Sequence, residues 1–294
     1  MRTHLVGALL SLSTLAAAQT SAPRDRYFES NGVRIRYVDE GSGEPVLLIH
    51  GYTATIETNW IIPGVFADLT KDHRVIAFDL RGHGKSDKPH DPEKYGGEIA
   101  RDAIRLLDQL HVQRVHIVGY SLGAAITLKL VTTNADRFVT ATLGGAAGFR
   151  NWRPFYDTLA QRTAVELESD VPFRGLVVAM TPADEPKRAE ADIRARSDAL
   201  VALNDVKALA AYQRGGTRGI NTTDAEVAKI QVPVLGVIGS VDGGLRNMRD
   251  LETILPGLKV VVIDDATHVG DRAAPRRPEF VAAIRDFIAA HRGP

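Results

Sequence analysis

A serine between two glycines lies where the sequence predicts an abrupt turn from a strand into a helix. The segment Gly119-Tyr-Ser121-Leu-Gly123 separates the apolar run Val115–Val118 from the helix-like Ala124–Val131. Such a turn strains the backbone of its central residue, and glycines two positions away remove side chains that would clash. We therefore predict Ser121 as an exposed nucleophile. The plainer alternative is an ordinary tight turn.

A histidine and an aspartate downstream complete the residues needed for nucleophilic catalysis. Serine is a weak nucleophile at neutral pH, so it needs a base to accept its proton and an acid to orient that base. His268 follows the apolar run Val260–Ile263, and Asp242 follows the run Val234–Ile238. We predict His268 as the general base and Asp242 as the orienting acid. The alternative for Asp242 is a solvated carboxylate that caps the next helix.

Asp264 and Asp265 lie closer to His268 in the sequence than Asp242 does. They share the loop of His268, whereas the orienting acid must reach the imidazole from the side away from the serine. A separate loop meets this requirement better, so Asp242 remains the predicted acid.

The elements that must position these residues follow an alternating pattern. Periodic apolar positions over Glu98–Leu110 and Phe280–Ile288 predict amphipathic helices. Short apolar runs alternate with such helices. Their length suits strands that are covered on both faces. The runs are Pro45–Ile49, Val75–Phe78, Val115–Val118, Val139–Leu143, Val234–Ile238 and Val260–Ile263. Parallel strands need crossovers, so the pattern predicts an α/β fold with a doubly wound, mostly parallel sheet.

The chain begins this pattern differently. Strand-like runs at Tyr27–Glu29 and Val33–Val38 flank the dipeptide Asn31-Gly32. This dipeptide tolerates the positive φ angles of a tight hairpin, which predicts an antiparallel start to the sheet.

The alternation stops between Phe149 and Lys229, where Ala, Arg, Glu and Leu dominate and no buried strand is evident. This composition predicts a helical cap inserted into the sheet domain. The expected organisation is a core of residues 24–148 and 230–294 with a cap of residues 149–229.

The chain resembles the large α/β-hydrolase family of lipases, esterases and their relatives. The order Ser121, Asp242, His268 matches the family, as do His50-Gly51 and the segment Asp79-Leu-Arg-Gly-His-Gly-Lys-Ser-Asp, each after a predicted strand. The resemblance covers nearly all of the chain after the N-terminal segment.

The resemblance implies an oxyanion hole formed by the backbone N–H groups of Tyr52 and Leu122. The N–H of Leu122 would lie at a helix N-terminus, where unpaired donors and the helix dipole favour negative charge. The expected reaction is acyl transfer from a small or medium carboxylic ester to water, through an acyl-enzyme on Ser121. No metal or organic cofactor is expected. His50 and His83 lack the spacing of a zinc hydrolase and are interpreted as structural.

Three other chemistries share the triad: carbon–carbon bond hydrolysis, lactone hydrolysis and perhydrolysis. Carbon–carbon hydrolases often carry a Trp after the catalytic histidine, and this chain has Val269 there. Relatives that hydrolyse epoxides or carbon–halogen bonds use an aspartate nucleophile, and Ser121 argues against them. A non-catalytic ligand-binding protein of the same fold is the alternative of another class.

Residues early in the expected cap are candidates to line its pocket, although aromatic residues there more often form internal packing. These are Phe149, Trp152, Phe155, Tyr156 and Met180.

Composition sets the remaining expectations. The 36 basic residues equal the 36 acidic ones, which disfavours nucleic acid as a partner, and there is no cysteine to form disulfides. Residues 1–18 combine a basic start, a short apolar run and a final Ala-Ala-Ala, which predicts a cleaved signal peptide and a secreted or periplasmic protein. The alternatives are a buried N-terminal helix and a membrane anchor. No stable membrane insertion is expected after cleavage. The sequence leaves the oligomeric state open.

Overall fold

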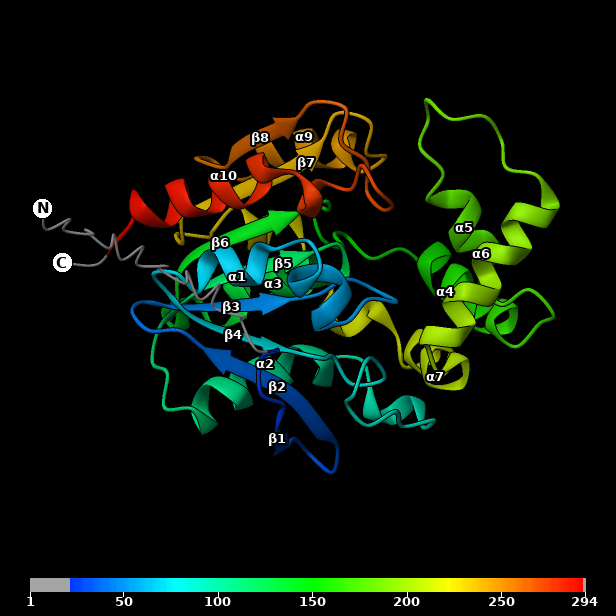
Figure 1. Cartoon of the computed structure of the whole chain (residues 1–294), viewed down its shortest axis with the longest axis horizontal. Coiled ribbons are helices and arrows are strands. Elements are labelled where there is room, and N and C mark those ends of the chain that lie inside the picture. Colours follow the sequence, from blue (N-terminus) through cyan, green and yellow to red (C-terminus); the bar gives the residue numbers. More distant parts are fainter. Residues whose placement is uncertain (1–21, 293–294) are drawn as a thin grey trace, which may run out of the picture.

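A computed structural model describes residues 22–292, in which eight strands form one sheet (Figure 1). The signal peptide predicted over residues 1–18 lies outside the described residues. The strands are β1 (Arg26–Glu29), β2 (Arg34–Glu40), β3 (Pro45–Ile49), β4 (Arg74–Phe78), β5 (Val115–Tyr120), β6 (Phe138–Gly144), β7 (Val234–Gly239) and β8 (Lys259–Ile263).

Helices connect these strands along the chain. They are α1 (Val65–Leu69), α2 (Glu98–Gln109), α3 (Leu122–Thr133), α4 (Pro154–Leu167), α5 (Arg174–Ala179), α6 (Glu190–Leu203), α7 (Val206–Gly215), α8 (Asp224–Val227), α9 (Leu245–Glu252) and α10 (Pro278–Ala289). Single turns of other helix types are η1 (Glu57–Ile61), η2 (Pro92–Lys94), η3 (Ala135–Arg137), η4 (Thr217–Ile220) and η5 (Ala274–Arg276).

The strand order is β1-β2-β4-β3-β5-β6-β7-β8, and the six strands from β4 to β8 in this order are parallel. β1 and β2 are antiparallel and continue the sheet beside β4. The hairpin between them has positive φ at Asn31 (53°) and Gly32 (78°), as that dipeptide predicted. The predicted α/β class with a mostly parallel sheet is confirmed.

Helices cover both faces of the sheet. One apolar cluster joins side chains of η1, α1 and α10 to the sheet, with Trp60, Phe66 and Phe280 among its buried members. The other joins α2, α3 and α9 to the opposite face. The predicted periodicity of α2 is confirmed, because Ile99, Ala103 and Leu106 are buried in that cluster. Burial on both faces explains why most of the strands read as continuous apolar runs.

β8 does not fit that expectation. It is the last strand of the sheet, and Lys259 and Val261 are exposed while Ile263 is buried. The prediction that this run is covered on both faces is therefore wrong, because an edge strand leaves part of one face open to solvent.

Helices α4 to α8 lie between β6 and β7 in the chain, and Figure 1 shows α4 to α7 beyond the arrowheads of the parallel strands. α4 packs against α7 and α5 against α6 around a separate apolar cluster that includes Leu167, Phe173, Val177 and Ile193. The carboxyl ends of the parallel strands therefore face this helical group. Within residues 22–292, no helix is both long and apolar enough to cross a bilayer.

Candidate active site

The turn at Ser121 has the strained backbone that its sequence setting predicts. Ser121 lies between β5 and α3 with φ 54° and ψ −111°, and its N–H donates to the carbonyl of Gly144 at 2.8 Å. A Cβ on Gly119 would overlap the carbonyl of Gly123, and a Cβ on Gly123 would overlap the carbonyl of Ile49. Gly119 thus lets β5 pack closely against α3, and Gly123 lets α3 pack closely against the end of β3.

Ser121, His268 and Asp242 form a continuous chain of hydrogen bonds. The Oγ of Ser121 lies 2.9 Å from Nε2 of His268, and Nδ1 of His268 lies 2.8 Å from Oδ2 of Asp242. The other oxygen of Asp242 accepts the N–H of Gly244 at 2.8 Å. The Asp242 side chain is 2% exposed, so little water competes for the imidazole. Ser121 follows β5, Asp242 lies in the loop after β7, and His268 lies in the loop after β8.

Asp264 and Asp265 point elsewhere. Asp264 lies 3.4 Å from the hydroxyl of Ser240, and Asp265 pairs with Arg272 at 2.6 Å. Among the described residues, Asp242 is the carboxylate that reaches the ring of His268.

Tyr120 contacts both the backbone and the ring of His268. Its hydroxyl donates to the carbonyl of His268 at 2.7 Å, and the two rings lie 5.4 Å apart. Burial raises the pKa of Tyr120 well above its usual range, so the hydroxyl stays protonated and can donate. Gly145 leaves room for both rings, because a Cβ there would lie 3.1 Å from Cε1 of His268. Sequence reasoning did not single out Tyr120, although its place beside Ser121 in β5 could have indicated it.

The backbone N–H groups of Tyr52 and Leu122 have no acceptor among residues 22–292. Leu122 is the first residue of α3, and Tyr52 follows Gly51 in the loop after β3. Gly51 lets this loop approach the serine, because a Cβ on Gly51 would lie 3.2 Å from the Cβ of Ser121. Two unpaired donors beside a serine hydroxyl suit the stabilisation of an oxyanion.

The sequence profile of the alpha/beta hydrolase fold family matches residues 44–270, a stretch that includes Ser121, Asp242 and His268. The chain belongs to this family. The resemblance to this family is thus confirmed, and the fold and the named hydrolase relatives support an enzyme.

A curated relative of this α/β hydrolase matches about half of the chain. The 2-hydroxymuconate semialdehyde hydrolase of Pseudomonas sp. (strain CF600) is 35% identical over 135 residues, which are 45% of this chain and 47% of that protein. The match thus spans about half the length of that relative.

Among the solved structures that match the fold over most of the chain are two lactone-degrading enzymes. The enol-lactonase from Burkholderia xenovorans LB400 has a TM-score of 0.72 at 23% identity, with 90% of this chain and 100% of that chain covered. An N-acyl homoserine lactone degrading enzyme has a TM-score of 0.69 at 27% identity, with 89% and 100% covered.

A cavity of about 690 Å³ in this hydrolase opens onto Ser121 and His268. The wall that α5, α6 and the segment after α5 contribute is largely apolar: Leu176, Val177, Met180, Leu200 and Leu203. Arg188 and Arg196 also line it, but both pair with Asp192. Sequence reasoning missed α5 and α6 as pocket walls, because nothing in a helix sequence alone tells which side faces a cavity.

The aromatic candidates at the start of the expected cap do not line this cavity, whereas Met180 does. Tyr156 contacts Trp152 and Phe155 instead, with ring centroids 5.3 Å and 6.0 Å away. Phe155 is 64% exposed, so internal packing is also wrong for this residue. Met180, the remaining candidate, lies in the cavity wall.

His50 and His83 are fully buried beside the loop that carries Tyr52. His50 contacts Gly51 and Leu80, so it links the loop after β3 to the segment after β4. His83 contacts the carbonyl of Arg81 at 3.1 Å within the segment after β4, and its ring lies 5.9 Å from the ring of Tyr52. Across residues 22–292, no three His, Cys, Asp or Glu side chains gather as a metal site would require.

Proposed function

We propose that the chain is a serine hydrolase that cleaves small or medium carboxylic esters through an acyl-enzyme on Ser121. The observation that carries the proposal is the hydrogen-bonded chain Ser121–His268–Asp242 beside two unpaired backbone N–H groups. Family membership alone does not distinguish ester hydrolysis from its alternatives.

In the proposed first step, Oγ of Ser121 attacks the ester carbonyl carbon while Nε2 of His268 takes the serine proton. Asp242 holds the imidazole through Nδ1–H and stabilises the imidazolium that forms. The carbonyl oxygen becomes an oxyanion that accepts from the N–H groups of Tyr52 and Leu122. His268 then gives its proton to the leaving alkoxide, and the alcohol departs.

The proposed second step returns the enzyme to its starting state. Water attacks the acyl-enzyme and gives a proton to His268, and a second oxyanion forms at the same N–H groups. When this intermediate collapses, the proton returns to Ser121 and the carboxylic acid leaves. The partly apolar cavity of about 690 Å³ favours a small-molecule ester over a polymer.

Lactones are a second candidate substrate. A lactone is a cyclic ester, and the N-acyl homoserine lactone degrading enzyme is 27% identical to this chain. The proposed steps apply unchanged, except that the leaving alkoxide stays attached to the acyl group. Carbon–carbon hydrolysis, perhydrolysis and non-catalytic ligand binding remain the rivals, and Val269 in place of a Trp weakens the first of these.

Labelling with a fluorophosphonate ester followed by peptide mapping tests the nucleophile. We expect one label, on Ser121, and none in Ser121→Ala. Ester turnover in Ser121→Ala should fall on the order of 10⁵-fold with an unchanged circular dichroism spectrum. Substantial turnover in that variant, or a label on another residue, would refute the proposal.

A substrate panel separates the rivals. Nitrophenyl esters of increasing chain length, simple lactones, a vinylogous diketone and acetate with hydrogen peroxide should be compared at equal enzyme concentration. Ester kcat/KM should exceed that for the diketone and for perhydrolysis. A preference for the diketone would replace ester hydrolysis with carbon–carbon cleavage, and binding without turnover would favour the non-catalytic alternative.

We also propose export to the periplasm or beyond, on the strength of the basic, apolar and small-residue pattern of residues 1–18. The protein isolated from its host should begin at Gln19. Mass spectrometry of its N-terminal peptide checks this, and a form that keeps Met1 would count against export.

A further inference from the structure

The N–H of Tyr52 belongs to the same peptide unit as the carbonyl of Gly51. A peptide unit is planar, so the groups that hold the carbonyl oxygen also set the direction of the N–H. The Nδ1 atom of His50 lies 2.8 Å from this oxygen, and the N–H of Ala54 donates to it at 3.2 Å. His50 thus contacts the Gly51–Tyr52 peptide, whose N–H is one of the two proposed oxyanion donors.

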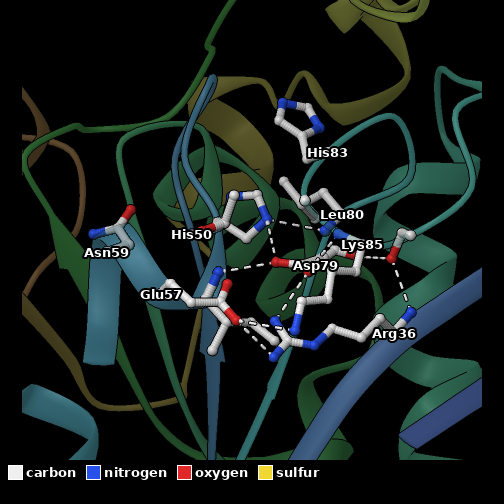
Figure 2. Close-up of polar contacts among 12 residues, drawn as sticks. Arg36, His50, Glu57, Asn59, Asp79, Leu80, His83 and Lys85 are labelled. Carbon is white, nitrogen blue, oxygen red and sulfur yellow. Dashed lines mark hydrogen bonds and ion pairs between the residues drawn. The ribbon is translucent and has the colours of Figure 1, made fainter. Parts of the chain in front are cut away.

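The backbone of Leu80 determines which nitrogen of His50 carries the proton. The N–H of Leu80 points at Nε2 of His50 at 3.0 Å, as Figure 2 shows. A backbone N–H can only donate, so Nε2 must accept and the single proton of the neutral ring must be on Nδ1. Nδ1–H therefore donates to the carbonyl of Gly51. Burial lowers the pKa of His50, which keeps the ring neutral.

The same loop is held at two further points. The N–H of Gly51 donates to Oδ1 of Asn59 at 2.8 Å, so both the N–H and the carbonyl of this glycine are hydrogen-bonded. At the end of the loop, the N–H of Ile56 donates to Oδ1 of the buried Asp79 at 2.9 Å. The other oxygen of Asp79 accepts from Arg36 at 3.1 Å and from the N–H of Lys85 at 2.9 Å. Asp79 thus fixes the end of the loop to β2 and to the segment after β4 (Figure 2).

We propose that His50 is a positioning residue for the oxyanion hole: as the Nδ1–H tautomer set by Leu80, it holds the Gly51–Tyr52 peptide with its N–H directed at the substrate oxygen. A hydrogen bond to the carbonyl also polarises the peptide and strengthens the N–H as a donor. The inference rests on the proposed ester hydrolysis. It assigns to a histidine outside the triad an effect on the transition state.

Two substitutions separate positioning from simple core packing. Asparagine places an amide nitrogen near the position of Nδ1, so His50→Asn can still donate to Gly51 but cannot accept from Leu80. Glutamine places an amide oxygen near the position of Nε2, so His50→Gln can still accept from Leu80 but cannot donate to Gly51. Each variant loses one buried hydrogen bond, so similar losses of stability are expected.

Their kinetics should differ. In His50→Gln we expect kcat to fall about 10- to 100-fold with KM within about threefold of wild type, since loss of a whole donor typically costs on the order of 10²–10³ in kcat. In His50→Asn kcat should stay within about threefold of wild type. The affinity for a trifluoromethyl ketone, whose adduct carries an oxyanion, should fall in His50→Gln by the same factor as kcat/KM.

Equal kcat in the two variants, or unchanged trifluoromethyl ketone affinity in His50→Gln, would overturn the inference. If neither variant folds, Asn59→Ala replaces them, because it releases the N–H of Gly51. It should show the same loss of kcat and of ketone affinity, and wild-type values for both would overturn the inference.

Ser121→Ala in the same assay separates this inference from the proposed function. Ester turnover that does not need Ser121 would refute the function. Turnover that needs Ser121 but is equal in the two His50 variants would refute the positioning role alone.

Discussion

At the scale of single residues, the hydrogen-bond partners distinguish Asp242 from the two aspartates nearer to His268 in the sequence. Asp242 bonds to Nδ1 of His268 at 2.8 Å from a buried position. Asp264 and Asp265 are both exposed and contact Ser240 and Arg272. A triad acid must orient the imidazole and stabilise its cationic form, which requires direct contact with the ring.

Replacing each aspartate by asparagine should therefore have unequal effects. Asp242→Asn should lower kcat by about 10²- to 10⁴-fold, because an amide can favour the wrong imidazole tautomer and cannot stabilise the imidazolium. Asp264→Asn and Asp265→Asn should each cost less than about tenfold. Asp265 has φ 53°, which asparagine also tolerates, so that variant is a matched control. A large loss in either control with near wild-type Asp242→Asn would reassign the acid.

At the scale of elements, the sharp turn between β5 and α3 depends on contact with β3. Gly123, in the first turn of α3, packs directly against the carbonyl groups of Ile49 and His50 at the end of β3. The helix can approach the sheet this closely only without a side chain at that position. The Gly51 loop, which follows β3, also lies close to Ser121, because a Cβ on Gly51 would be 3.2 Å from the Cβ of Ser121.

Gly123→Ala should accordingly destabilise the protein by about 1–3 kcal/mol, because the new methyl group overlaps backbone that cannot move away. Gly97→Ala is the control: Gly97 has φ −66°, and its nearest contact for a Cβ would be 3.7 Å away. That variant should change the free energy of unfolding by less than about 1 kcal/mol. Urea unfolding curves of both variants check this, and equal midpoints would contradict the packing argument.

At the scale of the whole molecule, buried neutral histidines tie stability to pH. His83 and His116 are 0% and 1% exposed. Burial lowers the pKa of His83 from 6.5 to about 3 and that of His116 from 6.5 to about 4. Above pH 6.5 both rings are neutral in the folded and unfolded states. Below it, the unfolded chain binds protons that the folded chain does not, so stability falls as the pH drops.

The free energy of unfolding should therefore fall between pH 6.5 and 5, by up to about 1.4 kcal/mol per pH unit for each such histidine. In His116→Asn this slope should decrease, since one of the contributing rings is gone. His111→Asn is the control, because His111 is exposed and its φ of 54° suits asparagine. Urea titrations at several pH values measure the slopes, and an unchanged slope in His116→Asn would contradict the assignment.

Much of the fold was predictable from the sequence because its signals are local. Apolar runs, helical periodicity and the Asn31-Gly32 hairpin each depend on residues close together in the chain, and all of these elements appear in the structure. The candidate site residues Ser121, Asp242 and His268 could be chosen from the sequence, because loops after parallel strands meet at one edge of the sheet. Their contact follows from this topology.

Other contacts between distant segments were decided by the tertiary structure alone. The exposure of β8 depends on its place at the edge of the sheet, and the cavity wall depends on how α5 and α6 turn toward the core. The protonated nitrogen of His50 depends on Leu80, which lies thirty residues away. No local pattern records such contacts, because they form only when the strands are packed side by side.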